Sequence, residues 1–111
     1  MLRRIGFFIL ALSLLSSHSV AGETKVAVQL NGIGAMTCAH WRSTAASRAE
    51  GTVWIFGFWS GLNYVAAASD QTQANSNEKA LIAEVVKVCA TDPSQILASA
   101  TWAAYLNLAE K

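Results

Sequence analysis

Gly51 to Ala68 reads GTVWIFGFWSGLNYVAAA, an apolar stretch that contains no charged residue. Its large apolar side chains recur three and four positions apart on more than one side of a helix. A helix that is apolar all round is surrounded by protein or by lipid. We therefore predict a buried central helix here, with its neighbours packed around it. The recurring residues are Trp54, Phe58 and Val65 on one side, and Ile55, Trp59, Leu62 and Ala66 on another.

A membrane span is the alternative for this stretch, because Gly57 and Gly61 repeat the four-residue spacing of transmembrane helix dimers. A helix over this stretch would be only ~27 Å long, which is marginal for a hydrocarbon core of about 30 Å. A single span would also leave Cys38 and Cys89 on opposite sides of the membrane, where they could not pair. We therefore favour the buried helix and expect no stable membrane span.

Residues 1–21 have the pattern of a cleaved secretory signal peptide. Two arginines form a positively charged start, residues 5–15 are apolar, and small residues precede the expected cleavage after Ala21. Removal of this segment leaves six basic and seven acidic residues, and so a net charge of −1. That balance provides no basic patch for nucleic acid. We expect a periplasmic protein with one small domain over residues 22–111.

The segments before the central helix predict an extended N-terminal arm and a first helix. Residues 22–36 alternate apolar and polar side chains in part, and they end in a turn signal rich in asparagine and glycine. Thr37 is a suitable cap for a helix that runs to about Arg48. We expect Glu50 and Gly51 to break that helix before the central one begins.

Two further helices are predicted after the central one, so that the expected fold is a small all-α domain of four helices. The third begins after a cap at Asn75 or Ser76. The fourth begins with Asp92 as the cap and Pro93 at the first helical position, and it ends near Leu108. The third helix has the clearest amphipathic pattern, with the stripes Leu81, Val85, Val88 and Ile82, Val86, Cys89.

Cys38 and Cys89 flank the central helix, and exported chains with two cysteines commonly pair them. The bond would join the first helix to the third and close a loop of about 50 residues, for which chain entropy predicts up to about 4 kcal/mol of stabilisation. A metal site and a reactive thiol are the rival roles. Cys38, His40 and Cys89 supply only three ligands without paired spacing, so we expect no metal.

The sequence offers no catalytic constellation. Ser60 and Gly61 lack the flanking residues of a nucleophile elbow, and the acidic residues are too scattered for a visible acid–base pair. We expect neither an enzyme nor a bound cofactor. Trp54, Phe58 and Trp59 concentrate the most apolar area in the shortest stretch, so they are candidates for the core and also for protein binding.

The chain carries Met36-Thr37-Cys38, then Trp41, then Val53 followed by Phe58, and finally Val85-x-x-x-Cys89-x-x-Asp92-Pro93. Together these motifs resemble the HdeA/HdeB family of periplasmic acid-stress chaperones, over roughly residues 36 to 97. The resemblance implies a small helical domain, one disulfide between the two cysteines and often a homodimer. It also implies ATP-independent binding of unfolded clients, after strong acid has removed structure and exposed apolar surface.

An acid response needs carboxylates whose protonation destabilises the folded state, and Glu50, Glu78, Glu84 and Asp92 are the candidates. The Cys89-x-x-x-Pro93 junction, beside a helix rich in glycine and aromatic residues, also resembles small periplasmic immunity proteins that neutralise one secreted effector. A structural periplasmic domain is the third possibility. In the first two cases the expected partner is a protein, either an unfolded client or one specific effector.

Overall fold

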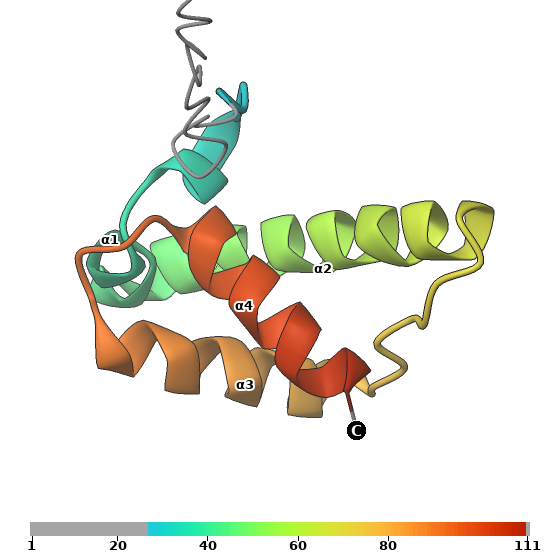
Figure 1. Cartoon of the computed structure of the whole chain (residues 1–111). Helices are drawn as coiled ribbons and strands as arrows, with labels where there is room; N and C mark the ends of the chain where they lie inside the picture. Colours follow the sequence, from blue (N-terminus) through green and yellow to red (C-terminus); the bar gives the residue numbers. More distant parts are fainter. Residues whose placement is uncertain (1–26, 111) are drawn as a thin grey trace, which may run out of the picture.

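A computed structural model describes residues 27–110 of the chain. Within them the chain forms one turn of 3-10 helix, η1 (Gly32–Ala35), and four α-helices, as the sequence predicts (Figure 1). The predicted signal peptide, its cleavage site and the first residues of the predicted domain lie outside the described residues. The α-helices are α1 (Cys38–Ser43), α2 (Ala45–Ala68), α3 (Glu78–Thr91) and α4 (Leu97–Ala109).

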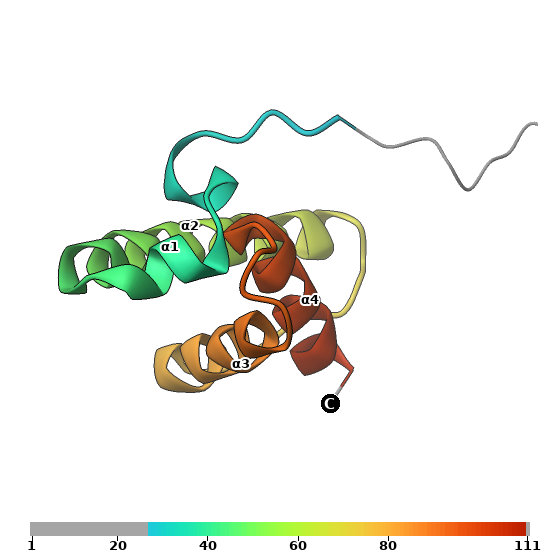
Figure 2. The same ribbon diagram turned by 90° about the vertical axis from the view of Figure 1, so that its left-hand side faces the viewer.

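α4 packs against both α2 and α3, and the core forms where these three helices and α1 meet (Figures 1 and 2). Each helix buries residues spaced three or four apart, which is the spacing of one helical face. The first stripe predicted for α3 is confirmed at Leu81 and Val85, which are buried together with Cys89 from the second stripe. The other large buried side chains are Ile33, Trp41, Ile55, Trp59, Leu97 and Tyr105.

The break between α1 and α2 lies at Thr44, so the predicted break at Glu50 and Gly51 is wrong. Thr44 has an extended backbone, and its side chain accepts a hydrogen bond from the N–H of Ser47 at 3.0 Å. This cap starts a new helix at Ala45, six residues before Gly51. Gly51 continues the helix, and its missing side chain makes room for the indole ring of Trp41.

The starts of α3 and α4 also differ from the predicted ones. Asn77, and not Asn75 or Ser76, caps α3, because its Oδ1 accepts from the N–H of Ala80 at 2.8 Å. α4 begins only at Leu97, after Ile96, so the predicted start at Asp92 and Pro93 is wrong.

The segment from Asp92 to Ile96 is a turn that pairs with the start of α1. The N–H groups of Cys38 and Ala39 donate to the carbonyls of Gln95 and Pro93 at 2.8 and 2.9 Å. These N–H groups belong to the first turn of α1, where no partner exists within the helix. The segment satisfies those donors, which explains why it does not itself become helical.

The predicted disulfide between Cys38 and Cys89 is confirmed. It joins the first residue of α1 to the last turn of α3, with the two Cα atoms 5.5 Å apart. Both cysteines are buried. The bond and the Asp92–Ile96 turn therefore fasten α1 to the same end of the helical core.

The N-terminal arm contains no helix or strand over the described residues 27–31, and it then forms η1 (Figure 2). η1 lies against α2, where Trp54 donates its indole N–H to the carbonyl of Asn31 at 3.1 Å. Ile33 is the buried residue that anchors η1 to the core. The chain therefore lies against the helices from η1 onwards.

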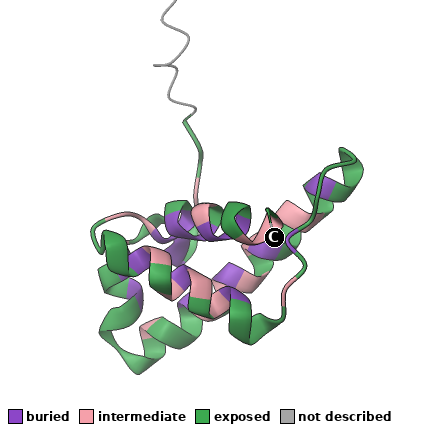
Figure 3. Cartoon of the chain, turned by 60° about the horizontal axis from the view of Figure 1, so that its bottom comes forward, coloured by how far each residue is buried: buried purple, intermediate pink, exposed green. Residues whose placement is uncertain are grey.

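α2 is buried along one stripe only, so the prediction that other elements surround it is wrong. With 24 residues it is longer than α3 or α4, and its far end extends beyond them (Figures 1 and 3). Val53, Tyr64 and Val65 are exposed on it. In the described part of the chain, no helix combines the length and hydrophobicity that crossing a membrane requires.

Candidate protein-binding surface

The three aromatic residues predicted as a binding cluster do not lie on one surface. Trp59 points into the core and is 3% exposed. Its indole N–H donates to the carbonyl of Ala74 at 3.1 Å, and its ring meets the edge of Tyr105 with 5.1 Å between centroids. A partner cannot reach Trp59 while the chain is folded.

Trp54 and Phe58 lie on another side of α2 and stack on each other, with 4.9 Å between ring centroids and 15° between planes. Both are partly buried. Trp54 covers Gly34 and bonds to Asn31, so its main contacts hold η1 on α2. Phe58 lines a hollow in the surface. Of the three predicted residues, Phe58 therefore has the clearest access to a partner.

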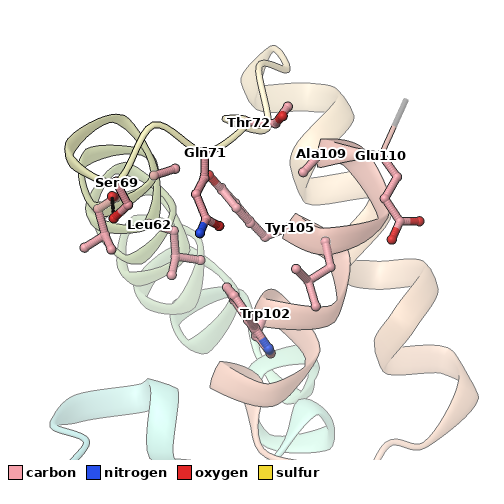
Figure 4. A pocket seen from close by; sticks show the side chains of 11 residues that line it. Leu62, Ser69, Gln71, Thr72, Trp102, Tyr105, Ala109 and Glu110 are labelled. Carbon is pink, nitrogen blue, oxygen red and sulfur yellow. Dashed lines mark hydrogen bonds between the residues drawn. The ribbon is translucent and has the colours of Figure 1, made fainter.

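Two hollows open beside Trp102, where α4 crosses α2. One, of about 450 Å³, lies between the second half of α2, the loop that follows it and α4 (Figure 4). The other, of about 480 Å³, lies between the N-terminal arm, α2 and the start of α4. Trp102 lines both, so we name them together the Trp102 groove. Its other large apolar residues include Val28, Leu30, Phe58, Leu62, Val65 and Leu106.

Trp102 is held in position by the residues beneath it. It is 46% exposed and stacks on Tyr105, with 6.1 Å between centroids and 8° between planes. Tyr105 is buried, and its hydroxyl donates to Oδ1 of Asn63 on α2 at 2.8 Å. The exposed indole ring is therefore supported by a side chain that also ties α4 to α2.

The lining of the groove is apolar with a polar rim at one end. Figure 4 shows Gln71 and Thr72 at this end, together with Glu110, the groove's only charged lining residue among those described. Sites with an apolar floor and few polar groups favour apolar side chains of a partner. The groove is suited to an apolar protein segment rather than to a charged ligand.

Sequence reasoning missed Trp102 and Leu106, although a signal was available. In the fourth helix, Ala100, Ala104 and Leu108 recur four positions apart and form an apolar stripe, and Trp102 lies off it. Trp102 and Leu106 are four positions apart and so share a helical face. Two large apolar residues on a face away from the core stripe indicate an exposed apolar surface.

The main electrostatic feature lies away from the groove, at the turn between α3 and α4. The carboxylate of Asp92 accepts hydrogen bonds from the hydroxyl and the N–H of Ser94, at 2.6 and 3.0 Å. These bonds hold the pKa of Asp92 below its ordinary value. Asp92 is fully exposed, and the turn that it shapes pairs with the start of α1.

Residues 27–110 contain no group of three or more histidine, cysteine or acidic side chains placed to hold a metal ion. Both cysteines are in the disulfide, and His40 is exposed at the start of α1.

Comparisons with family models, curated proteins and solved structures found no match to this chain. The resemblance to the HdeA/HdeB family therefore rests on the sequence motifs around the two cysteines, and it stays a prediction.

Proposed function

We propose that this chain is an exported, HdeA/HdeB-like protein that binds other proteins without ATP and holds their apolar segments in the Trp102 groove. The observation that carries the proposal is the groove itself. It opens between two helices and the arm, it is lined mainly by apolar side chains, and Trp102 is exposed at its centre. Exposed aromatic anchors of this kind are typical of protein interaction sites.

A periplasmic location is part of the proposal. The buried disulfide supports it, because disulfides form and persist in oxidising compartments. The basic and apolar start of the sequence supports export through a cleaved signal peptide. Both observations agree with the compartment in which an acid-stress chaperone would act.

Acid is the proposed signal for wider exposure of apolar surface. Protonation of Asp92 removes the charge that strengthens its bonds to Ser94, and so weakens the turn that is paired with α1. The pKa of Asp92 is lowered by folding, so its contribution to stability is present above the unfolded value and is lost as the pH falls through the folded value. Loosening of this end would give clients access to further apolar residues.

One observation also favours the immunity-type alternative. The groove is already open in the folded chain, so a single specific partner could bind at neutral pH without any loss of structure. In that case one effector, rather than many unfolded clients, would occupy the groove.

The test is suppression of client aggregation. A client enzyme is shifted to about pH 2–3, and separately heated at about pH 7, with and without the protein after export and processing. We expect suppression in acid by the wild-type chain and a clear loss of it in Trp102→Ser. Met36→Ser is the matched control, because Met36 is 45% exposed and lies outside the groove.

The outcome separates the candidates. If the protein suppresses client aggregation neither in acid nor at neutral pH, the proposal that it holds unfolded clients is wrong. The effector-binding alternative would then remain. Suppression that Trp102→Ser and Met36→Ser reduce equally would show that clients are held somewhere other than the Trp102 groove.

A further inference from the structure

The Trp102 groove follows one face of α4 along almost the whole helix. Its lining residues on α4 recur three or four positions apart, from Ala98 to Glu110. A stretch of helix between those two residues is ~18 Å long. The groove therefore has room for a partner segment of about five extended residues, or of about three helical turns.

The two ends of the groove differ in charge. Every residue that lines the end near the N-terminal arm is uncharged. At the other end Glu110 belongs to the lining, and the exposed Asp70 lies between the lining residues Ser69 and Gln71 in the sequence (Figure 4). Consecutive Cα atoms are only ~3.8 Å apart, so Asp70 brings a second carboxylate close to this end.

The C-terminal ends of α2 and α4 also lie at this end of the groove. Residues next to both helix ends are in its lining. The C-terminus of a helix carries about −0.5 elementary charge, which a lysine or arginine in the last turn offsets. Neither α2 nor α4 has a basic residue in its last turn. Lys79, the described basic residue nearest to Asp70 along the chain, does not line the groove.

We propose that the segments held in the Trp102 groove are apolar stretches with lysine or arginine at one end, and that this basic end lies over the C-terminus of α4. The inference rests on the proposed function and names the class of segment that the groove selects. The apolar side chains of such a segment cover Trp102 and Leu106. Its cationic end lies beside Glu110 and Asp70.

Charge complementarity is the reason to choose this class of segment. An acidic end would be repelled by the two carboxylates and by the two helix ends, and an uncharged end would leave them without a partner. Exposed ion pairs add little affinity, but charges at the rim of an interface suppress wrong partners and fix the register. The apolar lining therefore supplies most of the affinity, and the acidic end supplies the selection and the orientation.

Peptide binding to the exported, processed protein at neutral pH tests the inference, because the groove is already open in the folded chain. Three labelled peptides have blocked ends and share a short core of leucine, phenylalanine and alanine. The first carries two lysines at one end, the second carries two glutamates there, and the third carries two lysines in the middle of the core. Fluorescence anisotropy measures each dissociation constant.

The first peptide should bind at least about fivefold more tightly than either of the others at about 0.1 M salt. Its advantage over the glutamate peptide should shrink at about 1 M salt, where charges are screened beyond about 3 Å. Trp102→Ser should weaken the binding of the lysine-ended and glutamate-ended peptides by a similar factor, because both use the apolar lining.

Glu110→Lys should reverse the preference, so that the glutamate peptide binds more tightly than the lysine-ended one. The helical circular dichroism spectrum should be kept, because a cation is favourable at the C-terminus of a helix. Glu50→Lys is the matched control, with the same change of charge at an exposed position of α2. Glu50 lies ~28 Å along the helix from Ser69, beyond the screening length of about 10 Å, so the preference should stay as in the wild type.

Three results would overturn the inference and leave the proposed function standing. One is equal binding of the lysine-ended and glutamate-ended peptides, with both weakened by Trp102→Ser. The second is a preference that Glu50→Lys changes as much as Glu110→Lys does, because the net charge of the chain would then attract the peptide. The third is a preference that persists when Trp102→Ser leaves all binding unchanged, because another surface would then hold the peptides.

Failure of the proposed function has a different signature. If none of the three peptides binds and clients are not protected from aggregation, the Trp102 groove holds no protein segment. The proposed function is then wrong, and this inference is wrong with it.

Discussion

Gly51 and Gly57 lie on the same helix in opposite surroundings. A Cβ at Gly51 would overlap the indole ring of Trp41, whereas a Cβ at Gly57 would meet nothing within 4 Å in the described chain. Trp41 is fully buried and donates its indole N–H to the carbonyl of Arg48 at 3.1 Å. The ring is thus held both by packing on Gly51 and by a bond to the same helix. Gly51 is therefore required for close packing, and Gly57 is not.

Alanine at these two glycines should change stability in opposite directions. Gly51→Ala forces the Trp41 ring to move, and overpacking of this kind costs about 1–3 kcal/mol, partly offset by the better helix propensity of alanine. Gly57→Ala has open space and should raise the free energy of unfolding by up to about 1 kcal/mol. Urea unfolding of the two variants and the wild type measures both effects. Equal stability of the two variants would contradict the packing assigned to Gly51.

At the scale of elements, the turn between α3 and α4 is the connection that holds several helices together. Besides pairing with the first turn of α1, it is tied back to α3, because the side chain of Gln95 donates to the carbonyl of Val88 at 3.1 Å. The N–H of Leu97 donates to the carbonyl of Met36 at 2.8 Å, which joins α4 to the residue after η1. One short turn therefore joins α1, α3, α4 and η1, and its shape depends on the carboxylate of Asp92.

Asp92→Asn should make the stability of the protein less dependent on pH in the acid range. The asparagine can still accept a hydrogen bond from the N–H of Ser94, but it carries no charge to lose. Because folding lowers the pKa of Asp92, the wild type loses stability as the pH falls below the ordinary aspartate value of about 4, and the variant lacks that contribution. Urea unfolding at about pH 7 and about pH 2.5 measures the difference.

Asp70→Asn is the control for this experiment, since Asp70 is exposed in the left-handed region at the far end of α2, where asparagine is well tolerated. An acid-dependent loss that is the same in the wild type and in Asp92→Asn would exclude the turn as part of an acid response.

The same turn shows why the fold was more predictable than its boundaries. The stripes of α3 follow from its own sequence, so the helix and its buried face could be predicted. Asp92 and Pro93 form a strong local helix start, but the carbonyl groups of Pro93 and Gln95 instead accept hydrogen bonds from the first turn of α1, which is distant in sequence. Similarly, the open groove at Trp102 depends on where α4 crosses α2, and no local pattern specifies that crossing.

The whole molecule combines a long helix with a small core. α2 has 24 residues, against 14 in α3 and 13 in α4, so part of it extends beyond the helices that could cover it. A domain of this size buries a smaller fraction of its surface than a large one and is correspondingly marginal. The apolar surface that the proposed binding needs stays exposed, so it contributes nothing to the free energy of folding. The disulfide stabilises the folded state and offsets this loss.

Removal of the disulfide should accordingly be severe. Cys38→Ala combined with Cys89→Ala leaves no free thiol, but it frees a loop of 51 residues in the unfolded chain. The expected loss is about 2–5 kcal/mol, a large share of the 5–15 kcal/mol that is typical of folded domains. Urea unfolding of the variant and of the reduced wild type measures the loss, and the two should agree. Thiol titration should find no free thiol in the native protein and two after reduction under denaturing conditions. Two reactive thiols in the native protein, or unchanged stability of the double variant, would contradict this role of the disulfide. The packing of the helices alone would then maintain the fold.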